Sequence, residues 1–527
     1  MSENSSFATS VVKFCISFIC FVFVKPNVLL AQETRVEQSS FLVEVNEIEI
    51  TGNTLFSDSK LIGSITPLEK NRVTLDRLIQ ARQEITDYYT EKGYIATGAF
   101  ILPQKLNKGK VNILIVEGKL SEIVFEQNNI VNRSYIISRL PSSGTVLNLN
   151  ELRRALSNLQ KSSFIKSIKS TITFTETGRI KLLLDVRENP RLTKEFVFSN
   201  SFSPSIGKFG GQAKFRFNAL GIGDLLEIST IKTQGLDQFS ALYSFPINKH
   251  DAQISFGYFK AKSDLVLEEL KELDINGQFH AYSINFNQPI LFGNGRQLEL
   301  GISFGSEKSE SFILDDFSFS FLDELDNGTI KVSELSFTQQ YSNKKIDKSF
   351  VLLSTFSVGI DLFDSTVTES GKDGLYWKWH FQSQGIFKLN SAFNLFSDIK
   401  LQVSPDNLFP SKQFSLGGIS SVRGYSRNLL LGNNGISVTK ELQTSLYKTS
   451  NLDLRLIGFI DVGKIWGEAA KINIDRDTLL SSGFGLQILK NELLNIRLDY
   501  AFPLFNTDNF TSESSTPNFT FTLQFVR

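Results

Sequence analysis

The sequence predicts a transmembrane β-barrel of 16 antiparallel strands, preceded by two small α+β modules. Three observations support this fold class. Alternating apolar and polar residues dominate from residue 190 to the end, the connections between these runs are long and short in turn, and two earlier segments share one order of strands and helices. With 527 residues, the chain also exceeds the size of one ordinary globular core.

The N-terminus is expected to be a secretory signal peptide over residues 1–31. An apolar run from Phe14 to Val24 follows a basic residue, and its 11 residues are too few to span a bilayer as a helix. A retained signal anchor is the alternative. Both cysteines, Cys15 and Cys20, lie in this segment, so we expect no disulfide, thiolate metal site or thiol nucleophile in the mature chain.

The first α+β module is expected over residues 41–119. It begins with a strand at Val43–Ile50, continues through a helix, and ends with strands at Ala99–Pro103 and Lys110–Val116. The apolar residues on one side of the helix are Leu75, Leu78, Ile79, Ile85 and Tyr89. This order, one strand before the helix and two after it, predicts a small mixed domain.

The second module is expected over residues 120–189 and repeats that order. Its strands are predicted at Leu120–Glu126, Ser170–Thr175 and Ile180–Arg187, and its helix carries apolar residues at helical spacing. Those residues are Leu149, Leu152, Leu156 and Leu159. The repetition predicts two modules of one kind in tandem.

Residues 190–527 are expected to form the barrel. In Gln212–Phe217, for example, Ala, Phe and Phe face one way while Gln, Lys and Arg face the other, and 16 such runs can be placed. Numbered from about Thr193, every second connection is on the side with long loops, and these connections include the long polar stretches Lys262–Asn276, Glu307–Thr329, Leu362–Asp373, Ser404–Gly435, Gly463–Thr478 and Pro503–Thr516. Short turns between them complete the pattern of an outer-membrane barrel. A soluble sandwich or repeat array is the alternative, but it would not keep this loop asymmetry through 16 strands.

A barrel of this width leaves an aqueous lumen, so the chain is expected to be a pore unless something plugs it. An enzyme is not expected, because His250, His280 and His380 show no ligand or triad spacing and no phosphate-binding glycine motif is present. We therefore expect no cofactor and no metal. The 55 basic and 55 acidic residues balance, which gives no indication of nucleic-acid binding.

Two short motifs lie near the C-terminus. Val422-Arg423-Gly424-Tyr425 falls in the sixth long connection, and Phe459-x-Asp461-x-Gly463 falls on the thirteenth strand. By parity, Asp461 points into the lumen, because the alternate residues of that strand are apolar. A guanidinium stays charged and offers two donors to a carboxylate, so the two motifs are candidates for one ion pair. A solvated loop cation and an ordinary lumen carboxylate are the alternative.

With these motifs on a barrel behind two α+β modules, the chain resembles the two-partner secretion transporters of the haemolysin secretion/activation type. Further segments that resemble the family are Gly93-Tyr94, Leu102-Pro103-Gln104, Val116-Glu117-Gly118 and Asn218–Asp224. The resemblance implies that the modules are periplasmic POTRA domains. It also implies that the sixth loop folds back into the pore, where Arg423 pairs with Asp461.

The resemblance implies an outer-membrane translocation pore whose partner is a secreted exoprotein of the TpsA type, bound in extended form by the POTRA domains. Outer-membrane lipid would surround the barrel, and the barrel-assembly machinery would insert it. An insertase for other barrels is the alternative within the same superfamily, and a passive porin is a third candidate. The short interval between residue 31 and the first module leaves little room for the N-terminal plug helix of many family members.

Overall fold

The computed structural model describes residues 42–527 except 66, 69–70, 106–107, 128–131, 161, 163, 176–178, 219, 294, 315–316, 320–327, 369–373, 468–476, 492 and 506–518. The predicted signal peptide and the interval after it lie outside the described residues. The chain divides into two compact units, Met1–Thr86 with Ala99–Ile115, and Asp87–Gly98 with Val116–Arg527. The domain boundaries at residues 41, 119, 120, 189 and 190 remain predictions.

The first compact unit contains two small sheets. Its elements are β1 (Leu42–Val45), β2 (Glu47–Thr51), α1 (Asp58–Ile62), β3 (Asn71–Thr74), most of α2 (Leu75–Glu91), β4 (Gly98–Phe100) and β5 (Lys110–Val116). β1 pairs antiparallel with β3, and the other sheet has the order β2-β5-β4. The single strand expected at Val43–Ile50 is therefore two strands. It divides at Asn46, whose N–H donates to the Gly109 carbonyl at 2.8 Å, because its halves pair with different partners.

The second unit begins with another α+β sheet. Its elements are β6 (Leu120–Phe125), α3 (Arg133–Arg139), α4 (Leu149–Leu159), β7 (Ile165–Phe174) and β8 (Ile180–Glu188), in the sheet order β6-β8-β7. Asn148 caps α4, since its side chain accepts from the N–H groups of Asn150 and Glu151. The seven-residue helix α3 was not predicted, because so short a helix shows no apolar periodicity.

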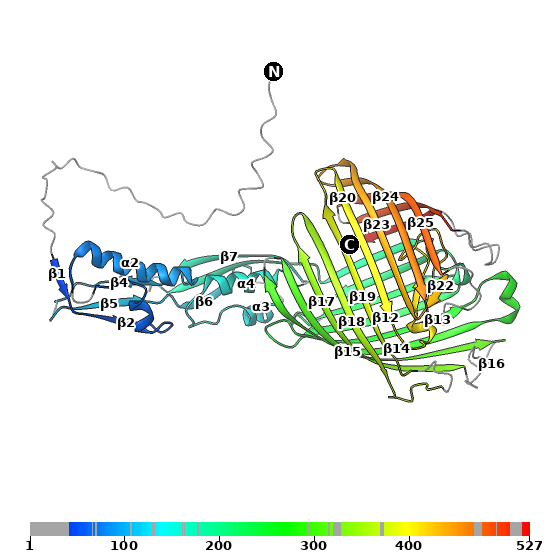
Figure 1. Ribbon diagram of the computed structural model, residues 1–527, viewed down its shortest axis with the longest axis horizontal. Helices are drawn as coiled ribbons and strands as arrows, with labels where there is room; N and C mark the ends of the chain where they lie inside the picture. Colours follow the sequence, from blue (N-terminus) through cyan, green and yellow to red (C-terminus); the bar gives the residue numbers. More distant parts are fainter. Residues whose placement is uncertain are drawn as a thin grey trace, which may run out of the picture. The chain divides into compact units, whose positions relative to one another are not determined.

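Within the described residues, sixteen long strands form a closed antiparallel barrel, which confirms the predicted fold class (Figure 1). The wall strands are β9 (Leu192–Ser199), β10 (Gly210–Phe217), β11 (Leu225–Thr233), β12 (Leu236–Pro246), β13 (Gln253–Asp264), β14 (Asn276–Gly293), β15 (Arg296–Ile313), β17 (Thr329–Lys344), β18 (Lys348–Ile360), β19 (Trp377–Lys388), β20 (Phe393–Val403), β23 (Asn434–Lys448), β24 (Leu452–Trp466), β25 (Thr478–Lys490), β26 (Leu494–Pro503) and β27 (Phe519–Val526). Three short strands, β16 (Phe317–Ser318), β21 (Phe414–Leu416) and β22 (Leu430–Gly432), lie in the connections.

The barrel connections follow the predicted alternation, with shifts of a few residues at several strand ends and two larger differences. β11 and β12 are joined by Gln234 and Gly235 alone, although this connection lies on the side with long loops. β15 continues to Ile313, so Glu307 belongs to the wall and not to the start of a loop as expected. The end of β15 was not predicted, because its backbone pairing continues into a polar stretch where the apolar alternation has ended.

The barrel closes where β27 pairs with β9, from Thr522 opposite Ser199 to Val526 opposite Glu195. Beyond the last backbone pair, Asn200 extends the contact. Its side-chain amide donates to the Phe519 carbonyl at 3.1 Å and accepts from the Phe521 N–H at 2.8 Å. A side chain thus takes the place of a backbone partner at this end of the seam.

The described residues include no helix with both the length and the hydropathy that crossing a bilayer requires.

Candidate functional site

The connection between β20 and β23, residues 404–433, lies against inward-facing side chains of the barrel wall. We call it loop 6. It contains the 3₁₀ helix η4 (Pro410–Lys412) and a small ladder in which β21 pairs with β22. Val422-Arg423-Gly424-Tyr425 forms part of its tip, between these two short strands. Because a two-stranded ladder supports it, the tip is presented on a defined hairpin.

Arg423 binds Asp461 of β24 through three hydrogen bonds. Its Nε and Nη2 donate to the two carboxylate oxygens at 2.7 and 2.8 Å, and its backbone N–H donates to Oδ2 at 3.1 Å. The exposed fractions of the two residues are 4% and 0%. The fork geometry is the strong form of a charge-assisted hydrogen bond, and its burial removes competition from water.

Three further charged side chains complete this site, which we call the loop-tip cluster: Arg423, Glu441, Asp461, Arg497 and Asp499. Arg423 Nη1 donates to Glu441 Oε1 of β23 at 2.8 Å. Arg497 of β26 donates to Glu441 at 2.7 Å and to Asp499 at 2.7 Å. With three carboxylates against two guanidiniums, removal of Arg423 would leave one cation for three buried anions.

The sequence prediction did not include Glu441, Arg497 or Asp499. Parity could have found the last two, because Ile496, Leu498 and Tyr500 occupy the lipid-facing positions of the same strand. Charged residues at inward positions of β26, two strands from β24, are therefore the signal that was missed. Parity alone could not say which of many inward charges reach loop 6.

Phe459 and Gly463 act on either side of Asp461 along β24. The Arg423 guanidinium lies 3.5 Å from the centroid of the Phe459 ring, which is a cation–π contact. At Gly463, a Cβ atom would lie 2.7 Å from Leu416 Cδ2 and 3.0 Å from Val422 Cγ2. The absence of a side chain at Gly463 thus lets loop 6 pack directly on the wall.

The other residues of the loop motif hold the tip in place. Val422 is buried in an apolar cluster whose described members are Phe414, Leu416, Val422, Tyr425, Leu430, Ile465 and Leu479. Gly424 has φ +86°, a conformation that L side chains rarely adopt. The Tyr425 hydroxyl lies 2.9 Å from the Leu480 carbonyl oxygen and accepts from the Phe505 N–H at 3.2 Å.

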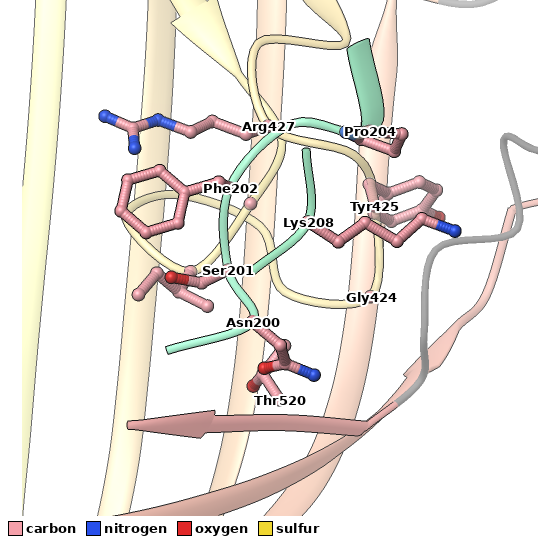
Figure 2. A pocket seen from close by; sticks show the side chains of 11 residues that line it. Asn200, Ser201, Phe202, Pro204, Lys208, Gly424, Tyr425, Arg427 and Thr520 are labelled. Carbon is pink, nitrogen blue, oxygen red and sulfur yellow. The ribbon is translucent and has the colours of Figure 1, made fainter. Parts of the chain in front are cut away.

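The loop tip also lies beside the barrel seam. A small cavity of about 20 Å³ is lined by Asn200 and Thr520 from the seam and by Gly424, Tyr425 and Arg427 from loop 6. Figure 2 shows the segment that carries Asn200, Phe202 and Lys208 next to these loop residues. The tip is therefore adjacent to the place where the first and last wall strands meet.

A second buried arginine joins α3 to a barrel turn. Arg139 Nε donates to Asp251 Oδ1 at 2.7 Å, and its Nη2 donates to the Asn248 carbonyl at 2.9 Å. Its guanidinium lies 3.4 Å from the centroid of the Tyr135 ring, and the Tyr135 hydroxyl also donates to Asp251 at 2.6 Å. We call Tyr135, Arg139, Asn248 and Asp251 the α3 cluster.

The Tyr135 phenol is held in its neutral form. Burial and then the Asp251 carboxylate raise the pKa of Tyr135 above its usual value. The hydroxyl therefore keeps the proton that it donates to Asp251. The α3 cluster was not predicted, because nothing in the sequence of residues 135–139 or of residues 248–251 indicates that these two segments meet.

Across the part of the chain that the structure describes, no group of three or more His, Cys, Asp or Glu side chains is arranged to hold a metal ion. The loop-tip cluster contains no His and no Cys, and its carboxylates are paired with guanidiniums. Its geometry fits the positioning of a loop.

Comparison with protein families gives two matches. Residues 178–488 match the family described as haemolysin secretion/activation protein ShlB/FhaC/HecB. Residues 43–118 match the POTRA domain of the ShlB type. The first match spans more than half of the chain and confirms the resemblance that the motifs indicated.

Two kinds of curated relative are similar to the chain. Outer membrane transporter CdiB of Escherichia coli O6:K15:H31 is 23% identical over 461 residues, which cover 83% of this chain and 74% of CdiB. Heme/hemopexin transporter protein HuxB of Haemophilus influenzae is 22% identical over 466 residues, which cover 83% of this chain and 79% of HuxB. The similarity therefore extends over most of each protein.

Solved structures share the fold. CdiB from Escherichia coli matches with a TM-score of 0.72 at 19% identity, over 94% of this chain and 93% of CdiB. BamA from Haemophilus ducreyi lacking POTRA domains 1-3 matches with a TM-score of 0.55 at 14% identity, over 92% of this chain and all of that chain. At these identities the likeness concerns the fold alone.

Proposed function

The chain belongs to the haemolysin secretion/activation family ShlB/FhaC/HecB, whose members are outer-membrane secretion transporters and not enzymes, and we propose that it exports one dedicated exoprotein through its barrel. In this proposal the periplasmic POTRA domains bind the exoprotein in extended form. The exoprotein then passes through the lumen, and loop 6 opens and closes the path.

The observation that carries the proposal is the buried contact of Arg423 with Asp461 inside the barrel. A barrel of 16 strands is wide enough for an aqueous lumen, and loop 6 occupies part of that lumen. The Arg423 contact holds the loop there. Passage of an extended chain requires the loop to move, so the contact is the natural point of control.

Substrate binding is proposed to use β-augmentation. Within the described residues, β7 is an edge strand of its sheet, and it pairs with β8 on one side only. An extended exoprotein segment can add to such an edge through backbone hydrogen bonds, which need no particular side chains. Folding of the exoprotein outside the cell would supply the driving energy, since the sequence has no Gly-x-x-x-x-Gly-Lys-Ser/Thr motif.

The test is Arg423→Ala in the full chain, with Arg427→Ala as the matched control on the same loop. Arg427 is exposed, whereas Arg423 is buried. We expect Arg423→Ala to abolish secretion while the folded barrel remains in the outer membrane, and Arg427→Ala to secrete normally. Unchanged secretion by Arg423→Ala would contradict the proposed role of loop 6.

Depletion of the protein separates the proposal from its alternatives. A dedicated transporter affects one exoprotein, which disappears from the culture medium. An insertase affects the abundance of many outer-membrane barrels, and a passive porin affects small-solute uptake. Loss of many barrels on depletion would favour the insertase function.

A further inference from the structure

A second buried group of charges holds loop 6 at the opposite end of its hairpin. Lys412, in η4 near the base of the loop, lies 2.9 Å from Glu307 Oε2 and 3.5 Å from Glu334 Oε2. Lys378 Nζ lies 3.1 Å from Glu334 Oε2, and the Tyr376 hydroxyl donates to the same carboxylate oxygen. We call Glu307, Glu334, Tyr376, Lys378 and Lys412 the loop-base cluster.

The charges of the loop-base cluster balance within it. Two ammonium groups face two carboxylates, and the four charged side chains are between 12% and 18% exposed. Lys412 is the one cation of this cluster that belongs to loop 6, because Lys378 lies on β19. Removing Lys412 therefore leaves Glu307 without its cation from the loop and leaves Glu334 with Lys378.

Other contacts strengthen the same end of the loop. Ser411 Oγ donates to Glu307 Oε1 at 2.8 Å. Leu408 and Phe409 are each 1% exposed and pack with Val332 of β17 and with Tyr376, the residue before β19. The base of loop 6 is thus held to the wall by the ion pairs of Lys412, by the Ser411 hydrogen bond and by apolar packing.

The two clusters reach different parts of the barrel wall. The loop-base cluster uses β15, β17 and β19, whereas the loop-tip cluster uses β23, β24 and β26. These two sets of strands are separated in the barrel order by β20. Loop 6 therefore connects two segments of the wall across the lumen side of the barrel.

We propose that Lys412 is a second positioning residue of loop 6, which keeps the loop in the lumen by holding its base to Glu307 and Glu334 while Arg423 holds its tip. Each attachment keeps the other end of the hairpin near its own partners, which raises the local concentration of the second contact. Loss of the base contact therefore weakens the tip contact as well, without altering any residue of the tip. The inference rests on the proposed function in that it assumes loop 6 obstructs the pore.

The experiment measures single-channel conductance of the purified full chain in planar lipid bilayers, where no exoprotein is needed. For Lys412→Met we expect the ratio of open to closed pores to rise about ten-fold, which corresponds to about 1.4 kcal/mol. Lys412→Arg, which keeps the charge, should stay close to the original ratio. Lys464→Met is the matched control, because Lys464 and its partner Asp477 are 53% and 47% exposed.

A purely structural role predicts a different result. In that case Lys412→Met lowers the thermal stability of the barrel but leaves the ratio of open to closed pores unchanged, and the proposal is overturned. Should Lys412→Met fail to fold, Glu307→Gln provides the second test, since it keeps the shape of the side chain and leaves Glu334 as a partner. We expect a smaller rise for Glu307→Gln, and no rise would also overturn the proposal.

The outcome is independent of the test of secretion. If Arg423→Ala secretes normally and Lys412→Met still opens the pore, the proposed role of Arg423 fails and the role of Lys412 stands. If secretion is lost in Arg423→Ala but the pores of Lys412→Met stay closed, the proposed role of Arg423 stands and the role of Lys412 fails.

Discussion

The loop-tip cluster and the α3 cluster each attach a segment of the chain through the same three kinds of group: an arginine, an aspartate and an aromatic ring. In each, a buried arginine binds an aspartate at 2.7 Å and covers an aromatic ring, at 3.5 Å for Arg423 and 3.4 Å for Arg139. The first attaches a loop to the barrel wall, and the second attaches a helix to a barrel turn. In both, the arginine and its aspartate lie far apart in the sequence.

They differ in burial and in the origin of the ring. The side chains of the loop-tip pair are 5% and 0% exposed, against 7% and 18% in the α3 pair. Phe459 belongs to the strand that receives Arg423, whereas Tyr135 lies one turn before Arg139 on the same helix. The α3 arginine is therefore oriented before docking, while the loop arginine gains its ring contact only when the loop is seated.

The largest effect is expected from Asp461→Asn. The change leaves Arg423 without its fully buried partner, and removal of one member of a buried pair costs about 3–5 kcal/mol. The ratio of open to closed pores in planar bilayers measures this loss. Asp477→Asn, at an exposed pair, is the control and should change the ratio little. Equal ratios for the two variants would show that the buried Arg423–Asp461 pair holds loop 6 no more strongly than an exposed ion pair does.

Arg139→Gln tests the α3 cluster and should have the next largest effect. The substitution removes the Arg139 charge from an ion pair that is partly open to water, so we expect the docking of α3 to weaken by about 2 kcal/mol. Faster amide hydrogen exchange in residues 133–139 measures it. The control is Arg153→Gln, an exposed arginine on α4. Identical exchange in the two variants would mean that Arg139 does not stabilise the docked helix.

Phe459→Leu tests the ring alone in the loop-tip cluster. The substitution keeps apolar volume beneath the guanidinium and removes the cation–π attraction, so we expect a loss of about 1–2 kcal/mol in loop seating. The conductance ratio should fall between those of the original protein and Asp461→Asn. A ratio as large as that of Asp461→Asn would mean that Phe459 acts through packing.

Tyr135→Phe should have the smallest effect, about 1 kcal/mol, since it removes one hydroxyl and keeps the ring under Arg139. It also gives a pH test with a definite sign. Burial raises the pKa of Tyr135 in the docked helix. The stabilisation of the docked helix by neutral Tyr135 is therefore complete below about pH 10, the usual pKa of tyrosine, and declines as the pH rises above it. Amide hydrogen exchange in α3, measured from about pH 8 to about pH 11, should show this decline in the original protein. If Tyr135→Phe showed an equal decline, another group would be responsible.

Sequence analysis reached the barrel because alternation is a property of each strand by itself. The strand count placed Arg423 between the eleventh and twelfth strands and Asp461 on the thirteenth strand, and the structure has them there. Alternation misled in two places: at Asn46, where one alternating run pairs with two different partners, and at Glu307, where a strand continues with polar residues. Pairing partners decide both cases, and a single run contains no information about its partner.

The sequence by itself determined the strand parity, the loop order and the two motifs, because each depends on residues that are close along the chain. The tertiary structure alone decided which charges meet. Glu441 and Arg497 join the loop tip, and Lys412 reaches Glu307, because closure of the barrel brings inward faces of distant strands around one loop. The physical reason is that an ion pair depends on the distance between two charges in space, and parity fixes only the direction in which each one points.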